Sequence, residues 1–125
     1  MLVDTDVLIA HLRGYPEARD WLRETRLRTR LAVSAVTLTE LTGGMRSAER
    51  REVNRLLSRL AVHPISVPIA HRAGDFMRAY RASHSGIGLG DYLIAATAEA
   101  HGLPLATLNV RHFPMFEGLQ APFRF

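Results

Sequence analysis

Three carboxylate side chains interrupt segments that are otherwise apolar enough to build a hydrophobic core. Asp4 follows two apolar residues, Glu40 stands beside leucines, and Asp91 heads the run Tyr-Leu-Ile-Ala-Ala. An isolated buried carboxylate is costly and normally takes up a proton instead. If the fold brings the three together, they form a strong site for a hard divalent cation such as Mg²⁺ or Mn²⁺. The sequence therefore predicts a fold in which distant segments meet at one acidic pocket.

Strand-like and helix-like segments alternate along the chain, which predicts an α/β domain with a mostly parallel sheet of four to five strands. The expected strands are Leu2–Val3, Leu31–Val33, Val62–Val67, Leu105–Thr107 and, as a last one, Leu119–Phe125. The expected helices are Thr5–Arg13, Pro16–Leu27, Thr37–Arg46, Ala48–Leu60, Ile69–Ser83 and Asp91–His101, with a short turn or helix over Val110–Phe116. Sites in such sheets form beyond the carboxyl ends of the strands, where Asp4 and Asn109 fall.

The composition limits the class of protein. A chain of 125 residues that is 47% hydrophobic is expected to form a single domain over residues 1–125. No apolar run approaches ~18 residues, so no membrane span is expected. The start, Met-Leu-Val-Asp, lacks the basic segment of a signal peptide, and there is no cysteine to form a disulfide or a thiolate site. These features predict a cytoplasmic protein.

All 16 basic residues are arginine. The absence of lysine excludes chemistry that needs one, such as a Schiff base. The net charge of +4 and the pI near 10.6 permit an acidic partner such as nucleic acid. Coding bias explains the excess of arginine equally well, and the arginines at positions 23, 26, 28 and 30 also fit a solvated helix face.

Asp4 and Asp91 each allow a local, non-functional interpretation. Aspartate is favoured as a helix N-cap, and either residue can serve as one. Asp6 then falls in the first turn, where the helix dipole stabilises a negative charge, so we expect a supporting role for it. Asp91, however, heads an apolar helix face formed by Ile94 and Ala95, as though the carboxylate were aimed inward.

Glu40 allows two interpretations as well. An exposed helical glutamate is one of them. Its own side of the helix is nevertheless small or apolar, with Thr37, Gly43 and Gly44 and no arginine to pair with it. We expect the two glycines to leave room around the carboxylate, although each lowers helix stability by ~1 kcal/mol.

Other metal or phosphate motifs are weak. The histidines at positions 11, 63, 71, 84, 101 and 112 show no metal-ligand spacing. The loop Ser-Gly-Ile-Gly-Leu-Gly over residues 85–90 lacks the lysine of a phosphate loop and the full dinucleotide-binding glycine pattern. We interpret this loop as a flexible hinge before Asp91.

The order of these motifs resembles a known family. Leu-Val-Asp-Thr-Asp-Val-Leu-Ile at the start, Thr-Leu-Thr-Glu-Leu around Glu40, Gly-Asp-Tyr-Leu-Ile-Ala-Ala-Thr-Ala around Asp91, and Leu-Ala-Thr-Leu-Asn-Val-Arg-His-Phe ending at Phe113 are similar to a PIN domain. More specifically, the chain resembles the VapC-type ribonuclease toxins of bacterial toxin–antitoxin pairs. The resemblance extends over essentially the whole chain.

The resemblance implies an α/β/α sandwich and an endoribonuclease dependent on Mg²⁺ or Mn²⁺. It implies that Asp4, Glu40 and Asp91 hold the metal. Family members commonly add a fourth acid after the last inner strand, where this chain has Asn109 and His112. Asn109 can still act in catalysis through its side-chain oxygen or by holding a water, but the departure puts a full second-metal site in doubt.

Partners also follow from the resemblance. Such toxins form homodimers and are inhibited by a cognate antitoxin, whose tail packs in an apolar groove and points a basic residue at the acidic pocket. The candidates for this groove are Leu8, Leu12, Trp21, Leu41, Met45, Leu56 and Leu57.

Two other functions also fit these residues. A non-catalytic PIN-like module that binds RNA or protein is one, because the fourth acid is missing. A phosphohydrolase of the haloacid-dehalogenase type is the other, since Asp4-Thr5-Asp6 matches its opening Asp-x-Asp signature; the lack of lysine argues against it. The RNA substrate, its cleavage motif and the number of metal ions do not follow from the sequence.

Overall fold

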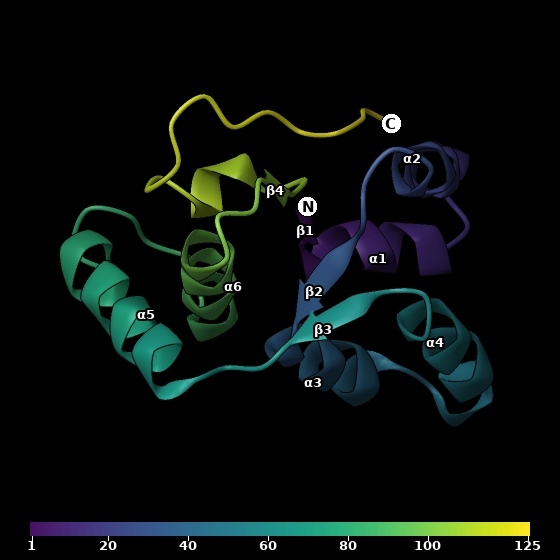
Figure 1. The fold of residues 1–125 in the computed structure, drawn as a ribbon, viewed down its shortest axis with the longest axis horizontal. Coiled ribbons are helices and arrows are strands. Elements are labelled where there is room, and N and C mark those ends of the chain that lie inside the picture. The colour runs from purple at the N-terminus through teal and green to yellow at the C-terminus, as the bar shows by residue number, and fades with distance from the viewer.

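The computed structural model describes residues 1–125 and contains a four-stranded, fully parallel sheet. The strands lie in the spatial order β3-β2-β1-β4 (Figure 1). Their bounds are β1 Leu2–Val3, β2 Ala32–Ser34, β3 Ala61–His63 and β4 Leu105–Ala106. The predicted α/β class with a parallel sheet is confirmed.

Six α-helices connect and cover the strands. They are α1 Thr5–Leu12, α2 Pro16–Arg26, α3 Ala35–Gly44, α4 Arg50–Leu57, α5 Val67–Tyr80 and α6 Leu89–Ala100, with short 3₁₀ helices over Ser47–Glu49 and Val110–His112. None of them combines the length and the apolar composition needed to cross a lipid bilayer.

The short strands place alternate side chains on opposite faces of the sheet, and each face has its own core. Leu2 and Ala32 belong to a buried cluster that includes residues of α5, α6 and Phe113. Val3 and Val33 belong to a second cluster with residues of α1, α2, α3 and α4. Because successive residues of a strand point to opposite faces, two adjacent apolar residues in β1 are enough to anchor both layers. The result is the three-layered arrangement visible in Figure 1.

The strand order places a topological switch point between β1 and β4. The chain moves from β1 to β2 and β3 on one side of the sheet, and then returns to add β4 on the other side of β1. In open parallel sheets, ligands bind beyond the carboxyl ends of the strands at this point. Asp4 directly follows β1 and Thr107 directly follows β4, so both lie at the favoured position.

The expected strand over Leu119–Phe125 does not form. The segment carries no strand residue, and its aromatic side chains instead pack on the first helices. The ring centroids of Phe123 and Trp21 are 6.2 Å apart, and those of Phe125 and Tyr15 are 4.5 Å apart. Pro122 has no backbone N–H to give to a sheet, so aromatic packing replaces pairing here.

Candidate active site

Asp4 is almost fully buried, with 4% of its surface exposed. It is the N-cap of α1, and its Oδ1 accepts a hydrogen bond of 2.7 Å from the backbone N–H of Thr5. Its Oδ2 accepts a second bond of 2.7 Å from the hydroxyl of Thr107, 103 residues along the chain. Burial, the neighbouring charge of Asp6 and the charge of Asp91 raise the pKa of Asp4 to about 7, although both hydrogen bonds oppose the shift. Asp4 therefore caps α1, and no positively charged side chain pairs with its carboxylate.

Asp6 lies in the first turn of α1 and links that helix to the segment after β4. Its Oδ2 accepts bonds from the Leu108 backbone N–H at 3.1 Å and from the Thr107 hydroxyl at 3.3 Å. Its other oxygen, Oδ1, is buried and has no hydrogen-bond partner. Burial raises the pKa of Asp6 as well. These contacts fit the supporting role expected for this residue, and they leave one oxygen free.

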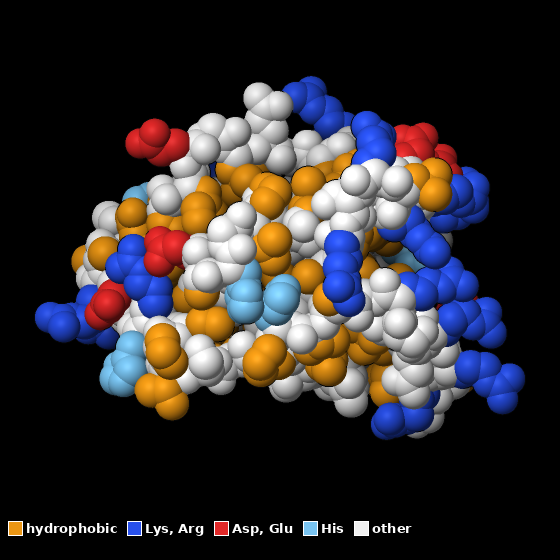
Figure 2. Space-filling model, in the orientation of Figure 1, with side chains coloured by type: hydrophobic (Ala, Val, Ile, Leu, Met, Phe, Trp, Pro, Cys, Tyr) orange, Lys and Arg blue, Asp and Glu red, His pale blue; other side chains and the backbone are white.

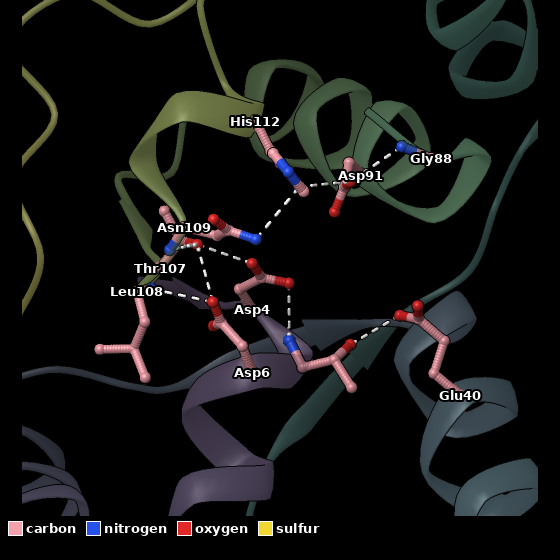
Figure 3. A network of polar contacts seen from close by, with 10 residues as sticks. Asp4, Asp6, Glu40, Gly88, Asp91, Thr107, Leu108, Asn109 and His112 are labelled. Carbon is pink, nitrogen blue, oxygen red and sulfur yellow. Dashed lines mark hydrogen bonds and ion pairs between the residues drawn. The ribbon is translucent and has the colours of Figure 1, made fainter. Parts of the chain in front are cut away.

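Glu40 reaches the same region from α3. Its Oε1 accepts a hydrogen bond of 2.7 Å from the hydroxyl of Thr5, the residue next to Asp4 (Figure 3). A Cβ atom added at Gly90 would lie 3.0 Å from Glu40 Oε2, so this glycine allows α6 to approach the carboxylate. The expectation that Gly43 and Gly44 provide the room was wrong, because a Cβ atom at either position would meet nothing within 4 Å.

Asp91 lies in the first turn of α6, but it is not the N-cap. The helix begins two residues earlier than predicted, at Leu89, and Gly88 is its N-cap. Asp91 Oδ2 accepts a hydrogen bond of 3.0 Å from the Gly88 backbone N–H and lies 3.0 Å from His112 Nδ1. The hydrogen bond from the Gly88 backbone N–H to Asp91 stabilises the first turn of the helix. Leu89 and Gly90 are therefore helical and do not form the hinge that the glycine pattern suggested.

The fold therefore gathers Asp4, Asp6, Glu40 and Asp91 around one space, as Figure 3 shows. The ion pairs in the chain are Arg19–Asp20, Arg72–Glu99 and His112–Asp91, so no arginine neutralises these four acids. As the side chains stand, no three acidic or histidine residues form a group that could hold an ion. The chemistry of the donors nevertheless fits a hard cation, since Asp6 Oδ1 is buried without a partner and the charge of Asp4 is uncompensated.

Asn109 and His112 border this space from the segment after β4. The side-chain nitrogen of Asn109 lies 3.2 Å from His112 Nδ1, and its backbone N–H donates to the Thr107 hydroxyl at 3.0 Å. His112 in turn contacts Asp91. The two positions proposed to replace a fourth acid thus belong to one polar network with Asp4 and Asp91 (Figure 3).

Two threonines and one glycine of this site were not singled out from the sequence. Thr5 joins the segment of Asp4 to Glu40, and Thr107 joins Asp4 to the segment after β4. Both threonine side chains are buried. Their positions could have identified them as site residues, since each is the first or second residue beyond a strand at the switch point. Gly90 carried no such signal, because its role depends on the distant Glu40.

Comparisons with known proteins agree with this arrangement. The family model described as "PIN domain" matches residues 1–115. Ribonuclease VapC10 of Mycobacterium tuberculosis is 64% identical over 123 residues, which cover 98% of this chain and 92% of the relative. Ribonuclease VapC19 of the same species is 41% identical and covers 98% of both chains. A chain of a toxin–antitoxin complex from Klebsiella pneumoniae superimposes with a TM-score of 0.82 at 29% identity, over 99% and 98% of the two chains.

The fold and site define a parallel α/β domain with an acidic pocket at the switch point of its sheet. With the family model covering residues 1–115, this chain belongs to the PIN domain family.

Proposed function

We propose that this chain is a metal-dependent endoribonuclease and the toxin of a toxin–antitoxin pair. The observation that carries the proposal is that Asp4, Glu40 and Asp91 border one space at the switch point and that no arginine forms an ion pair with them. Glu40 is linked to the residue after Asp4 through Thr5, and the charge of Asp91 contributes to the raised pKa of Asp4. The curated relatives, at 64% and 41% identity, are named ribonucleases, and the solved structures of similar fold include toxin–antitoxin complexes.

In this mechanism Asp4 and Asp91 would hold a divalent cation, and Glu40 would orient the attacking water or hold a second cation. When bound, the cation polarises the phosphodiester and lowers the pKa of a coordinated water. The hydrogen bonds from Thr5 and Thr107 keep the carboxylates of Glu40 and Asp4 in place for this task. By analogy with the family, water cleaves the bond between phosphorus and the 3′ oxygen, which leaves a 5′-phosphate and a 3′-hydroxyl.

The donor set favours Mg²⁺ or Mn²⁺ over Zn²⁺. Its members are carboxylate oxygens, and the chain has no cysteine. Hard oxygen ligands suit Mg²⁺ and Mn²⁺, whereas zinc sites are usually built from cysteine and histidine. Asn109 can add a further oxygen or hold a water beside Asp4.

Removal of divalent metal is expected to abolish cleavage. Purified chain should cut RNA in the presence of Mg²⁺ or Mn²⁺, and EDTA should reduce the rate to below about 1%, because the attacking water then loses its activation. Gel analysis of cellular RNA with and without EDTA, followed by re-addition of metal, measures this. Cleavage that persists in EDTA would contradict the mechanism, and RNA binding without cleavage under any metal would favour the non-catalytic module.

The charge distribution is suited to an RNA substrate. Arginine side chains gather over the end of the molecule that α2 and α4 form (Figure 2). Arg19, Arg23, Arg26, Arg55 and Arg59 line two pockets at this end. Such charges attract a phosphate backbone from a distance, and salt screens the attraction.

An apolar groove beside Glu40 fits the tail of an antitoxin. It encloses about 200 Å³, and its apolar lining residues are Ile9, Leu12, Leu41, Met45 and Val53. Of the groove candidates suggested by the sequence, Leu12, Leu41 and Met45 are among them, whereas Leu8 is fully buried core. Glu40 and Arg13 also line the groove, so a basic residue of a bound tail would reach the acidic pocket. A homodimer is proposed by analogy with the family.

Substitution of Met45 by glutamine is expected to weaken antitoxin binding about tenfold or more while leaving RNA cleavage unchanged. The reason is that an amide buried in an apolar contact costs ~1–3 kcal/mol. Met77→Gln is the matched control, since Met77 lies on α5 in the other core cluster. Calorimetric titration with the antitoxin encoded beside this gene measures both. Equal affinities for the two variants would place the antitoxin elsewhere.

A further inference from the structure

We infer that His112 is a positioning residue, which holds one oxygen of Asp91 so that the other faces the acidic pocket. This inference rests on the proposed metal site and assigns a role to a side chain at a position where an acid was expected. Asp91 is the one acidic hydrogen-bond partner of the His112 side chain, and Asn109 is its other side-chain partner.

The two oxygens of Asp91 have different surroundings. Oδ2 accepts from the Gly88 backbone N–H at 3.0 Å and contacts His112 Nδ1 at 3.0 Å. Oδ1 has no hydrogen-bond partner in the chain, and Figure 3 shows it directed toward Asp4. Two donors on one oxygen fix the rotation of the carboxylate, which leaves Oδ1 as the oxygen presented to a cation. In metal sites, partners of this kind set the orientation of the ligating group.

The contact with Asp91 determines which nitrogen of His112 carries a proton. Asp91 Oδ2 already acts as the acceptor of the Gly88 N–H, so we place the hydrogen of the 3.0 Å contact on Nδ1, which donates to the same oxygen. Nδ1 then has no lone pair left for the amide of Asn109, which lies 3.2 Å away. With the proton on Nδ1, the Asn109 amide is expected to rotate by 180° from the orientation described above, so that its oxygen and not its nitrogen faces the ring; otherwise two N–H groups would oppose each other.

The residues around His112 restrict the position of its ring. His112 ends the 3₁₀ helix Val110–His112, and its backbone N–H donates to the Asn109 carbonyl at 2.9 Å. The next residue, Phe113, is only 1% exposed and belongs to the same core cluster as α6. On its other side the ring lies beside Gly86, where a Cβ atom would be 3.9 Å from Nε2. His112 thus joins three segments at the edge of the pocket.

An acid at this position would act differently from the histidine. A carboxylate about 3 Å from Asp91 Oδ2 would add repulsion to a pocket that has no arginine partner, whereas Nδ1–H adds a donor. The histidine thus orients Asp91 without adding a further carboxylate to Asp4, Asp6, Glu40 and Asp91. We therefore expect the metal affinity of this chain to depend on the Nδ1–H donor.

The test compares His112→Ala with His112→Asn, because the asparagine amide nitrogen can take the place of Nδ1 whereas alanine cannot. Mn²⁺ titration followed by electron paramagnetic resonance measures free and bound ion without reference to activity. We expect about 10–100-fold weaker Mn²⁺ binding in the alanine variant and near wild-type binding in the asparagine variant. Wild-type affinity in His112→Ala would overturn the inference, and so would equal weakening in both variants, since the imidazole itself would then be the ligand.

A second measurement needs no metal. Long-range ¹H–¹⁵N spectra of the metal-free protein report the tautomer of His112, and we expect a proton on Nδ1. A proton on Nε2 alone would overturn the inference even if metal binds as proposed. If wild-type protein binds no Mn²⁺ at all, the proposed function fails together with this inference, whereas normal wild-type binding with an unaffected alanine variant defeats the inference alone.

Discussion

Asp4→Asn is expected to lower RNA cleavage by at least about 100-fold without unfolding the protein. Loss of a residue that only orients a metal ligand typically lowers metal affinity or activity by ~10–100-fold. Asp4 is proposed as a direct ligand, so its loss should have at least this effect. Asparagine is as good an N-cap as aspartate, so α1 keeps its start. The Thr107 hydroxyl can accept from the new amide, so the buried contact survives. Cleavage rates in Mg²⁺ and circular dichroism measure the two parts of this prediction.

A matched control distinguishes the loss of a site carboxylate from the loss of one negative charge elsewhere on the protein. Asp75→Asn removes one exposed negative charge on α5, away from the arginines of α2 and α4, and should leave cleavage unchanged. Asp91→Asn should behave like Asp4→Asn. Wild-type cleavage by either site variant would show that these carboxylates do not hold the catalytic metal.

Metal-free protein is expected to lose stability as the pH rises from about 4 to about 7. The folded pKa of Asp4 is about 7, above its ordinary value of 3.8, so the folded state binds more protons than the unfolded state in this range. The free energy of unfolding is then highest near or below pH 4 and falls as Asp4 ionises. At 1.36 kcal/mol per pKa unit the loss is on the order of 4 kcal/mol, and Asp6 shifts in the same direction.

Urea unfolding at a series of pH values, with EDTA and then with Mg²⁺, measures this dependence. Mg²⁺ should restore stability at pH 7–8, by ~2.7 kcal/mol when its concentration is about 100 times its dissociation constant. Asp4→Asn should be more stable than wild-type protein at pH 8 without metal, because the buried charge is gone. A wild-type stability that rises between pH 4 and 7, without any response to Mg²⁺, would contradict the site described here.

The general location of the site was predictable because it depends on local patterns. An acid directly after a short apolar strand, as at Asp4, lies at the carboxyl edge of a parallel sheet whatever the rest of the fold does. Asp91 was recognisable from the apolar helix face that it heads. These patterns need only strand and helix periodicity, which the sequence displays directly.

The details that depend on contacts between distant segments were not predictable. Gly90 was assigned to the flexible loop over residues 85–90, so the helix was expected to start at Asp91. In the fold Gly90 is helical, and Asp91 accepts a hydrogen bond from Gly88 at the helix start. Glu40, 50 residues earlier, occupies the space that a side chain at position 90 would need. The hydrogen bonds from Thr5 to Glu40 and from Thr107 to Asp4 could not be predicted either, because they form only once α3 and β4 lie beside β1.

The error at the C-terminal segment has a similar cause. Alternating apolar residues over 119–125 resemble a strand, but such alternation also suits a chain that lays aromatic rings on a helix. Phe123 and Phe125 do this against Trp21 and Tyr15, two aromatic residues that the pattern of the segment itself cannot reveal.

The most direct test of the central claim is a crystal of this chain soaked in Mn²⁺ and measured for anomalous scattering. A peak bound by carboxylate oxygens of Asp4 and Asp91, with Glu40 in contact directly or through a water, is the predicted result. An empty pocket at saturating Mn²⁺, with these carboxylates left as they are in the metal-free protein, would contradict it.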